Sequence, residues 1–329
     1  MRVCNPPRPN FADRNLDLVL EILQHPIHVR LYSTAPYLAE LYRSDLASRI
    51  QTSLNSDRRD FSRPLAIRKG KKNYFIPGSS QDLIFHAVCA AAFYKPFFES
   101  FSAEEIETDY CPPLWREIQK NSCGDSQVML AYWQQLNAET GRRMQRDFSH
   151  VLHADISDCY ASVDTGALSN LIRDLGADSA LANGFQSIHE YWAQAGCRGL
   201  PLTGSSYLPL KIYLKQVDDH LKSAGVPFIR LQDDFRIFGH TECELQSHQT
   251  ELEKALQLLG MRINPKKTQI VSHENQPPIT TRFSPRDWRR TFSQGILLPL
   301  LSDSLRLGLL RPASLRLLRW CYGHTCWPS

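Results

Sequence analysis

The stretch IRLQDDFRIFGHT, residues 229–241, places two adjacent carboxylates, Asp233 and Asp234, inside a run of β-branched and aromatic residues. Apolar residues lead into the pair over positions 226–231 and lead out of it over positions 235–238. This pattern predicts two short strands that meet at a tight turn, a β-hairpin with the acid pair at its tip. Because burying an unpaired charge costs several kcal/mol, the pair should face solvent, a cation or a metal ion.

A third carboxylate, Asp155, ends a predicted strand in HVLHADISDCYASV, residues 150–163. A strand-end aspartate can simply cap a following helix, and Ser157 or Asp158 could also do that. Two strands that end in aspartate have a chemical use, because two divalent ions about 3.5–4 Å apart need bridging carboxylates during phosphoryl transfer. Magnesium prefers such hard oxygen ligands. Nucleases and phosphatases use the same groups, so three acids alone leave the reaction open.

The composition is that of an ordinary globular protein, with 329 residues of which 42% are hydrophobic and 22% charged. No apolar run approaches the about 20 residues that span a bilayer, and the N-terminus lacks the pattern of a secretory signal. Nine cysteines without paired spacing are typical of a reduced cytosolic protein. We therefore expect a cytoplasmic protein that makes no membrane contact.

Apolar periodicity and turn residues predict alternating helices and antiparallel strands, which indicates an α+β fold. Helices are expected within residues 12–55, at 80–101 after a Ser79 or Ser80 cap, in part of 103–147, at 165–195, after a Gly/Pro/Ser loop within 196–225, and at 242–260. Strands are expected in a hairpin over 63–77, near 151–155, on both sides of the acid pair, and over 261–271.

Four segments in this order resemble the successive palm motifs of reverse transcriptases. They are ADISDCYASV (154–163), GLPLTGSSYLPLKIYL (199–214), IRLQDDFRIF (229–238) and LLGMRINPKKTQI (258–270). RPLAIRKGKKNYFIP (63–77) resembles the fingers hairpin of the same family, so the similarity spans roughly residues 60–272. The wording "DIS…Y" and "R..DDFRIF" is similar to that of bacterial abortive-infection and defence-associated reverse transcriptases.

The resemblance implies a right-hand polymerase fold, with fingers, a palm built on an antiparallel sheet, and a reduced helical thumb. The implied divisions are an N-terminal helical extension (1–60), fingers (61–150), a palm that carries the catalytic motifs (151–275) and an Arg-rich thumb-like segment (276–329). That last segment holds eight arginines and two aspartates between Arg282 and Arg319, a net charge of +6 that suits a nucleic-acid backbone. A solvated helix face is the alternative.

The resemblance also implies a metal site. Asp155 and Asp233 would hold two Mg²⁺ ions, or Mn²⁺ in their place, with Asp234 beside them and the Ile156 carbonyl as a further ligand. Lys267 matches the lysine thought to protonate the departing pyrophosphate, with Lys266 as the alternative.

For the incoming nucleotide, Tyr160 matches the family's aromatic steric gate, whose ring would clash with a ribose 2′-hydroxyl; a core tyrosine is the alternative. Arg68, Lys69, Lys71 and Lys72 occupy the position where the fingers grip triphosphate, and Lys72 is the preferred single choice. Gly199, Pro201 and Gly204 match the loop under the nucleotide and the templating base, where small residues let the backbone approach closely.

Two departures fall on the template and primer side. Leu231, followed by Gln232, stands where the family usually has an aromatic residue that contacts the primer end. Between Pro201 and Gly204, Leu202 and Thr203 interrupt the usual Pro-Gln-Gly or Pro-x-Gly loop. We take Leu231, Gln232, Pro201 and Thr203 as the template and primer contacts and expect unusual template handling.

The resulting hypothesis is an RNA-directed DNA polymerase in bacterial anti-phage defence, with a specialised template or none. RNA, the DNA product, and a partner subunit or second copy are the expected partners. The alternatives are a retron-type reverse transcriptase, a non-catalytic polymerase-fold subunit that binds RNA, and a nuclease. A zinc site at Cys321, His324 and Cys326 would need a fourth ligand that is not evident nearby.

Overall fold

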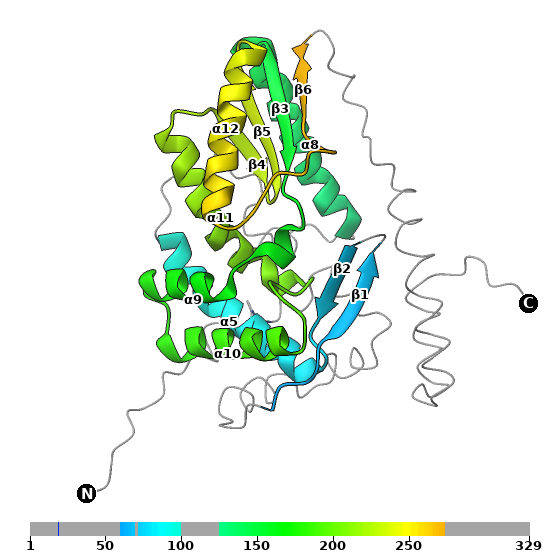
Figure 1. Ribbon diagram of the computed structural model, residues 1–329, viewed down its shortest axis with the longest axis vertical. Coiled ribbons are helices and arrows are strands. Elements are labelled where there is room, and N and C mark those ends of the chain that lie inside the picture. The colour runs from blue at the N-terminus through cyan, green and yellow to red at the C-terminus, as the bar shows by residue number, and fades with distance from the viewer. Residues whose placement is uncertain (1–18, 20–59, 70–71, 100–124, 274–329) are drawn as a thin grey trace, which may run out of the picture.

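The computed structural model describes residue 19 and residues 60–69, 72–99 and 125–273. These residues form a four-stranded sheet with its covering helices, and beside it a group of helices with a two-stranded hairpin (Figure 1). Helices and antiparallel sheets together confirm the predicted α+β character.

The four-stranded sheet is wholly antiparallel in its order β4-β5-β3-β6. Its strands are β3 (His150–Asp155), β4 (Phe228–Leu231), β5 (Asp234–Gly239) and β6 (Gln269–Ser272). The two central strands are almost continuously buried, because helices cover both faces of the sheet. The predicted hairpin with an acid pair at its tip is therefore present as β4 and β5.

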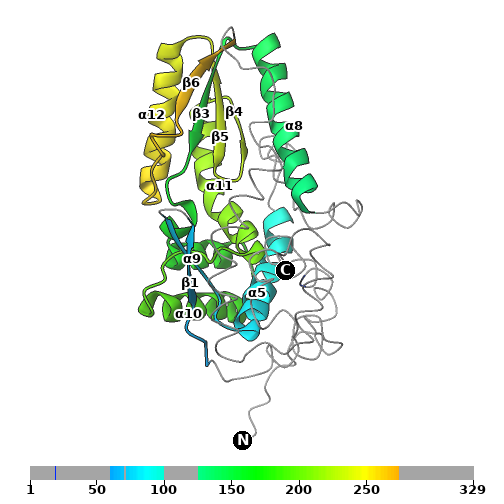
Figure 2. The ribbon, with the colours of Figure 1, turned by 90° about the vertical axis from the view of Figure 1, so that its right-hand side faces the viewer.

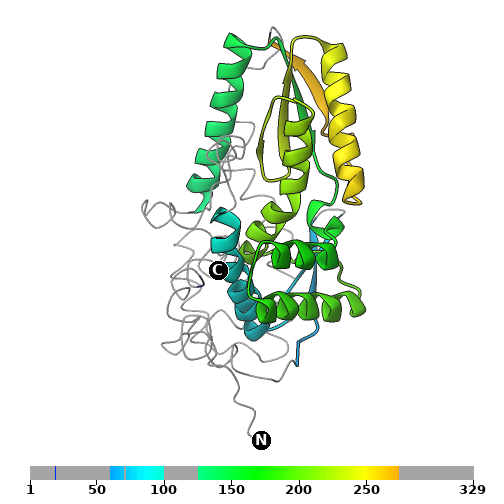
Figure 3. The same ribbon diagram turned by 90° about the vertical axis from the view of Figure 1, so that its left-hand side faces the viewer.

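Helices α8 (Asp125–Arg146) and α12 (Glu242–Leu258) cover opposite faces of this sheet (Figures 2 and 3). Helix α11 (Tyr207–Ser223) packs beside α12 and continues toward the second group. Thr241 starts α12 by accepting a hydrogen bond from the Glu244 N–H, as expected for an N-cap threonine. Gly260, at φ 69°, follows its end.

The second group contains the hairpin of β1 (Leu65–Lys69) and β2 (Lys72–Ile76) with α5 (Ser80–Glu99), α9 (Thr165–Asp174) and α10 (Ser179–Gln194). Helix α11 packs against α5 and α9, which joins this group to the sheet. The predicted hairpin over 63–77 is confirmed, and Ser79 accepts the Asp82 N–H at the start of α5.

Two predicted elements differ from the structure. The single helical stretch 165–195 is two helices, because Gly176 turns the chain at φ 83° and Asp178 caps a new helix by accepting the N–H groups of Ala180 and Leu181. The strand predicted over 261–271 is confined to β6, because a turn in which the Lys267 N–H donates to the Asn264 carbonyl occupies the residues before it.

Several predicted features lie outside the described residues. They are Lys71, the Arg-rich segment 276–329 with Cys321, His324 and Cys326, and the N-terminal helices, of which only Val19 is described, in a helix and buried. Across the described ranges, no helix combines the length and the apolar character needed to cross a bilayer.

A buried ion pair fixes the hairpin that carries the acid pair to α11. Asp218 accepts from Arg230 Nε at 2.7 Å and from Nη2 at 2.6 Å, and the side chains of both residues are almost completely buried. The remaining terminal nitrogen of Arg230 donates to the Gln232 carbonyl at 3.1 Å, at the tip of the hairpin. The pair therefore anchors the turn as well as the strand.

Replacement of Asp218 by alanine should lower the free energy of unfolding by about 3–5 kcal/mol, because it leaves the Arg230 charge buried without its partner. The neighbouring Asp219 provides a matched control, since it forms an exposed pair with Lys215. Asp219→Ala should cost less than about 1 kcal/mol. Urea unfolding of both variants measures the difference, and equal losses would contradict the anchoring role.

Candidate active site

The three predicted carboxylates meet at one end of the central strands. Asp155, the last residue of β3, is the register partner of Asp234, the first residue of β5. Asp233 lies in the turn just before, and its carbonyl accepts the Ile156 N–H at 3.3 Å. Because directly opposed residues in an antiparallel pair are neighbours, this register brings the acids together from segments far apart in the sequence.

Asp155 is 4% exposed and its carboxylate has two partners from the loop before β6. Lys267 Nζ donates to Oδ1 at 2.8 Å and Asn264 Nδ2 donates to Oδ2 at 3.0 Å, while the Asn264 N–H donates to the Asp155 carbonyl at 2.7 Å. Asp155 does not cap a helix, so this alternative role is wrong. The following 3₁₀ helix, Cys159–Ser162, begins after Asp158, whose side chain makes no capping hydrogen bond.

The site carries excess negative charge. Burial and the charge of Asp233 raise the pKa of Asp234 to about 7, with a further rise from Asp155 and opposition from Arg236 and Lys267. Burial disfavours the charged form of Lys267, but its hydrogen bond to Asp155 and the surrounding aspartate charges outweigh this and raise its pKa. The raised pKa of Asp234 therefore comes first from burial and second from the neighbouring carboxylates, and the two cations offset only part of it.

Arg236 is a buried cation close to the acids that the sequence reasoning missed. It is 6% exposed, donates to the Phe235 carbonyl at 3.1 Å, and lies with its guanidinium 5.6 Å from the centre of the Trp133 ring of α8. Burial lowers its pKa, while the charges of Asp234 and Asp155 favour its charged form. The sequence did offer one signal for Arg236, which stands two residues after the acid pair in a strand that is buried on both faces.

Asn264 was also missed, because the motif that contains it drew attention to its lysines alone. Of those lysines, Lys267 reaches Asp155, whereas Lys266 is exposed and contributes a backbone N–H to Asn264 Oδ1 at 3.3 Å.

The ion pair between Lys267 and Asp155 occupies one of the predicted metal ligands. Among the described residues, no group of three His, Cys, Asp or Glu side chains is arranged to hold a metal ion.

The residues nevertheless fit a divalent cation chemically, because three carboxylates lie together and hard oxygen atoms are the ligands that such ions prefer. Lys267 Nζ occupies Oδ1 of Asp155, one of the two carboxylate oxygens that could bind such an ion. The Lys267 side chain is 61% exposed, so little packing opposes its movement away from Asp155.

Tyr160 and Gln232 face each other beside the acids. The Tyr160 hydroxyl donates to Gln232 Oε1 at 3.4 Å, and both side chains are half-buried. Gln232 has φ 55°, a left-handed backbone conformation that is uncommon for a residue other than glycine. Gln232 adopts this conformation because it lies in the tight turn between β4 and β5, which also carries Asp233.

The backbone of Tyr160 is in contact with the loop 199–206. The Leu200 N–H donates to the Tyr160 carbonyl at 2.8 Å. Gly199, at φ 77°, comes so close that a Cβ there would lie 2.2 Å from the same carbonyl oxygen. On its other side the loop reaches β2, where the Leu202 N–H donates to the Phe75 carbonyl at 2.8 Å. Gly199 therefore lets the loop backbone come close to the backbone of Tyr160, and the expected approach to a nucleotide stays a prediction.

The other predicted nucleotide and template residues divide into three groups. Pro201, Thr203 and Gly204 are buried within the loop. Leu231 is 2% exposed and packs in the core, so its side chain is not presented to a primer. Arg68 and Lys72 lie at the tip end of the β1–β2 hairpin, opposite Asn73 and Lys69 respectively.

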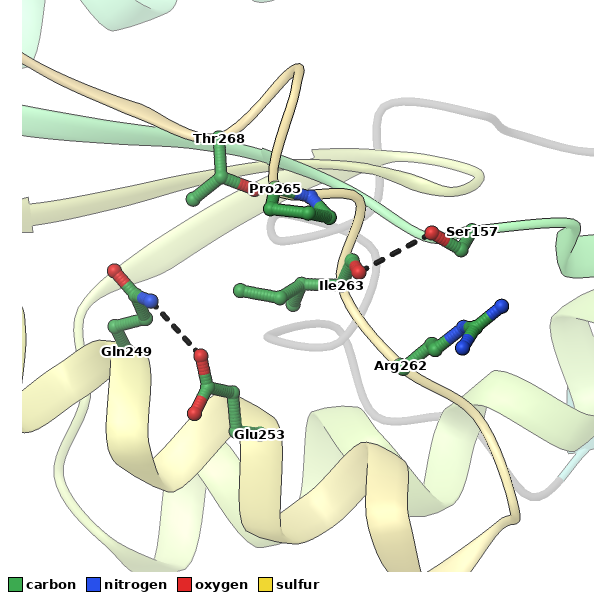
Figure 4. Close-up of a pocket in the computed structure, with 7 residues that line it drawn as sticks. All are labelled: Ser157, Gln249, Glu253, Arg262, Ile263, Pro265 and Thr268. Atoms are coloured by element: carbon green, nitrogen blue, oxygen red, sulfur yellow. Dashed lines mark hydrogen bonds between the residues drawn. The ribbon is translucent and has the colours of Figure 1, made fainter.

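A pocket lies between α12 and the loop that precedes β6 (Figure 4). It is lined by Ser157, Gln249, Glu253, Arg262, Ile263, Pro265 and Thr268. Ser157 Oγ closes one end by donating to the Ile263 carbonyl at 3.2 Å. None of the three predicted catalytic acids lines it, so we do not assign it to the site.

The raised pKa of Asp234 predicts a pH dependence of stability. Between its ordinary value of 3.8 and about 7, the folded protein holds a proton that the unfolded chain has released. The contribution of Asp234 to the free energy of unfolding of the metal-free protein should therefore fall as the pH rises through this window. Asp234→Asn should remove this loss and stabilise the protein at about pH 8 by on the order of 2 kcal/mol, with a smaller gain at about pH 4.5.

Urea unfolding in the presence of a chelator at both pH values measures this effect. Asp219→Asn, on the exposed face of α11, is the control; it leaves Asp234 in place, so its stability should stay close to that of the parent at both pH values. A gain for Asp234→Asn that is the same at both pH values would contradict the assignment of the proton to Asp234.

The chain is similar to one known protein family and to solved structures. A family model described as "Reverse transcriptase (RNA-dependent DNA polymerase)" matches residues 111–291. A search of the curated proteins found no match. Among solved structures, the chain is similar to telomerase from Candida albicans in complex with a TWJ fragment of telomeric RNA, at 11% identity and a TM-score of 0.41. That match covers 67% of this chain and 44% of the telomerase chain. Since the family model spans more than half of its length, the chain belongs to the reverse transcriptase family.

Proposed function

We propose that this chain is a DNA polymerase that adds deoxynucleotides by two-metal phosphoryl transfer, on a specialised template or none, in bacterial anti-phage defence. The observation that supports this best is the convergence of Asp155, Asp233 and Asp234, which the pairing of β3 with β5 brings together at one end of the sheet. Family membership supplies the reaction class, reverse-transcriptase-type nucleotidyl transfer.

In this proposal Asp155, Asp233, Asp234 and the Ile156 carbonyl hold two Mg²⁺ ions, or Mn²⁺ ions. Two such ions stabilise the attacking and leaving oxygens of an in-line phosphoryl transfer. Lys267 gives up its contact with Asp155 and turns its ammonium group to the triphosphate, where it protonates the departing pyrophosphate. Asn264 keeps the Asp155 carboxylate oriented while Lys267 moves.

The nucleotide would lie against Tyr160, whose ring excludes a ribose 2′-hydroxyl, with Gly204 in the loop beneath it. Arg68 and Lys72 on the fingers hairpin would contact the triphosphate. The Leu202 to Phe75 hydrogen bond supports this arrangement, because it joins that hairpin to the loop. The proposed divisions are an extension (1–60), fingers (61–150), palm (151–275) and thumb-like segment (276–329).

The unusual template handling would come from Gln232 rather than Leu231. Leu231 is buried, whereas Gln232 stands at the exposed end of the hairpin and already contacts Tyr160. A polar amide there, in place of an aromatic surface, favours hydrogen bonding over stacking with the primer end. We propose a dedicated RNA and a partner subunit or second copy as the remaining components.

A non-catalytic, RNA-binding polymerase subunit is the second candidate. The ion pair between Lys267 and Asp155 favours it, since a charged partner already satisfies one of the acids without a metal. The two candidates differ in whether nucleic-acid synthesis depends on the acids.

Asp233→Asn should reduce deoxynucleotide incorporation by on the order of 10³-fold, because it removes a carboxylate charge at the metals. The parent and the variant, each expressed in bacteria with the native flanking DNA, are purified and their bound nucleic acids sequenced. DNA bound to the parent alone supports the polymerase, and its sequence identifies the template or shows that none was used. RNA in both preparations with DNA in neither supports the second candidate instead. Phage plating on the same two strains tests the defence role.

Lys267→Met should lower kcat by about 10²-fold or more, because it removes the proposed general acid, and should also make metal binding tighter by freeing Asp155. Lys266→Met is the matched control, since Lys266 is exposed. Single-turnover nucleotide addition measures the first effect, and metal titration followed by intrinsic fluorescence measures the second. Equal defects in the two variants would show that Lys267 has no special part in the chemistry.

A further inference from the structure

A chain of buried polar side chains lies under the loop 199–206, away from the three acids. His86 of α5 and His189 of α10 are both buried, and their Nε2 atoms are 3.1 Å apart. His86 Nδ1 lies 2.7 Å from Ser205 Oγ, and His189 Nδ1 lies 3.1 Å from the Gly199 carbonyl. The two histidines therefore connect the first residue of the loop with a residue near its end.

The loop continues this network internally. Thr203 Oγ1 lies 2.8 Å from Ser205 Oγ, and Ser206 Oγ donates to the Pro201 carbonyl at 2.6 Å. All these side chains are buried, so each hydrogen bond is shielded from competition by water. A loop of this length would otherwise bury several polar groups without partners.

The positions of the protons follow from the acceptor at one end. A carbonyl oxygen only accepts, so His189 Nδ1 carries a proton that it donates to Gly199. Burial lowers the pKa of His189 to about 3, against a smaller opposite effect of that hydrogen bond, so its Nε2 is an acceptor at neutral pH. His86 must then donate from Nε2 and accept the Ser205 hydroxyl proton at Nδ1.

Aromatic rings enclose the two imidazoles. The ring centroid of Phe185 is 5.2 Å from that of His86 and 4.4 Å from that of His189, and Trp192 is 5.0 Å from His189. Such an apolar enclosure disfavours a charged imidazole.

The two histidines hold the part of the loop 199–206 that contacts the Tyr160 backbone. Gly199 and Leu200 both contact the Tyr160 carbonyl, the first by close packing and the second by a hydrogen bond of 2.8 Å. A displacement of Gly199 is therefore transmitted directly to Tyr160. The Leu202 N–H carries the same displacement to Phe75 in the β1–β2 hairpin.

We propose that His86 and His189 are positioning residues that, through Ser205 and Gly199, hold the loop 199–206 against Tyr160 and thereby set discrimination between deoxyribonucleotides and ribonucleotides. The nucleotide part of this proposal rests on the proposed polymerase function. The positioning part concerns the loop itself and can be measured without any activity.

The first test is amide hydrogen exchange in the full-length, metal-free protein. Ser205→Ala removes one buried hydroxyl from the network, and Ser169→Ala removes a buried hydroxyl from α9, where it donates to the Thr165 carbonyl at 2.7 Å. Exchange at Leu200 and Leu202 should be about tenfold faster in Ser205→Ala than in the parent and unchanged in Ser169→Ala. Equal rates in the two variants would overturn the positioning role.

The second test is nucleotide selection in steady-state kinetics. In Ser205→Ala, the ratio of kcat/KM for a deoxynucleotide to that for the matching ribonucleotide should fall about tenfold, with more of the change in KM than in kcat. His189→Asn can still present an N–H to Gly199 and should keep most of the discrimination, whereas His189→Leu should lose it.

The outcomes separate the two proposals. Faster exchange with an unchanged selection ratio would overturn the link to Tyr160. Faster exchange with no polymerase activity even in the parent would support the positioning of the loop and overturn the proposed function, and with it the nucleotide part.

Discussion

The register of β3 against β5 is the constraint on which the site depends. It places Asp155 opposite Asp234 at the end of both strands, and it pairs Val151 with Phe238 in the core. Because side chains alternate between the two faces of a strand, a slip of one residue would move every side chain to the opposite face, disrupt the packing there and separate the acids. Apolar packing on both faces therefore maintains the geometry of the carboxylates.

This arrangement has an electrostatic consequence. Burial, together with the neighbouring aspartate charges, raises the pKa of Asp234 to about 7, so ionisation of this carboxyl group disfavours the folded state in the absence of metal. Lys267 and Arg236 offset part of this repulsion, one from the exposed side and one from within the sheet. The exposed Lys267 can move away from Asp155 when a metal ion binds, whereas Arg236 is buried and cannot move in this way.

The loop 199–206 joins the two groups of secondary structure. It contacts β2 through Phe75, Tyr160 through its carbonyl, and α5 and α10 through the two histidines. The proposed nucleotide site is therefore assembled from segments that come together only in the folded chain. A shift in either group would reach Tyr160 through this loop.

The sequence by itself determined the β4–β5 hairpin, the strand that ends at Asp155 and the α+β class, because alternation of apolar residues and turn chemistry act over a few positions. It also identified Lys267 through the order of its motifs. Only the tertiary structure decided that Asn264 holds Asp155 from 109 residues away, that His86 meets His189 across 103 residues, and that Leu231 is buried. The identity of a polar residue does not reveal whether it is solvated or buried against a distant partner, because only tertiary packing decides between the two.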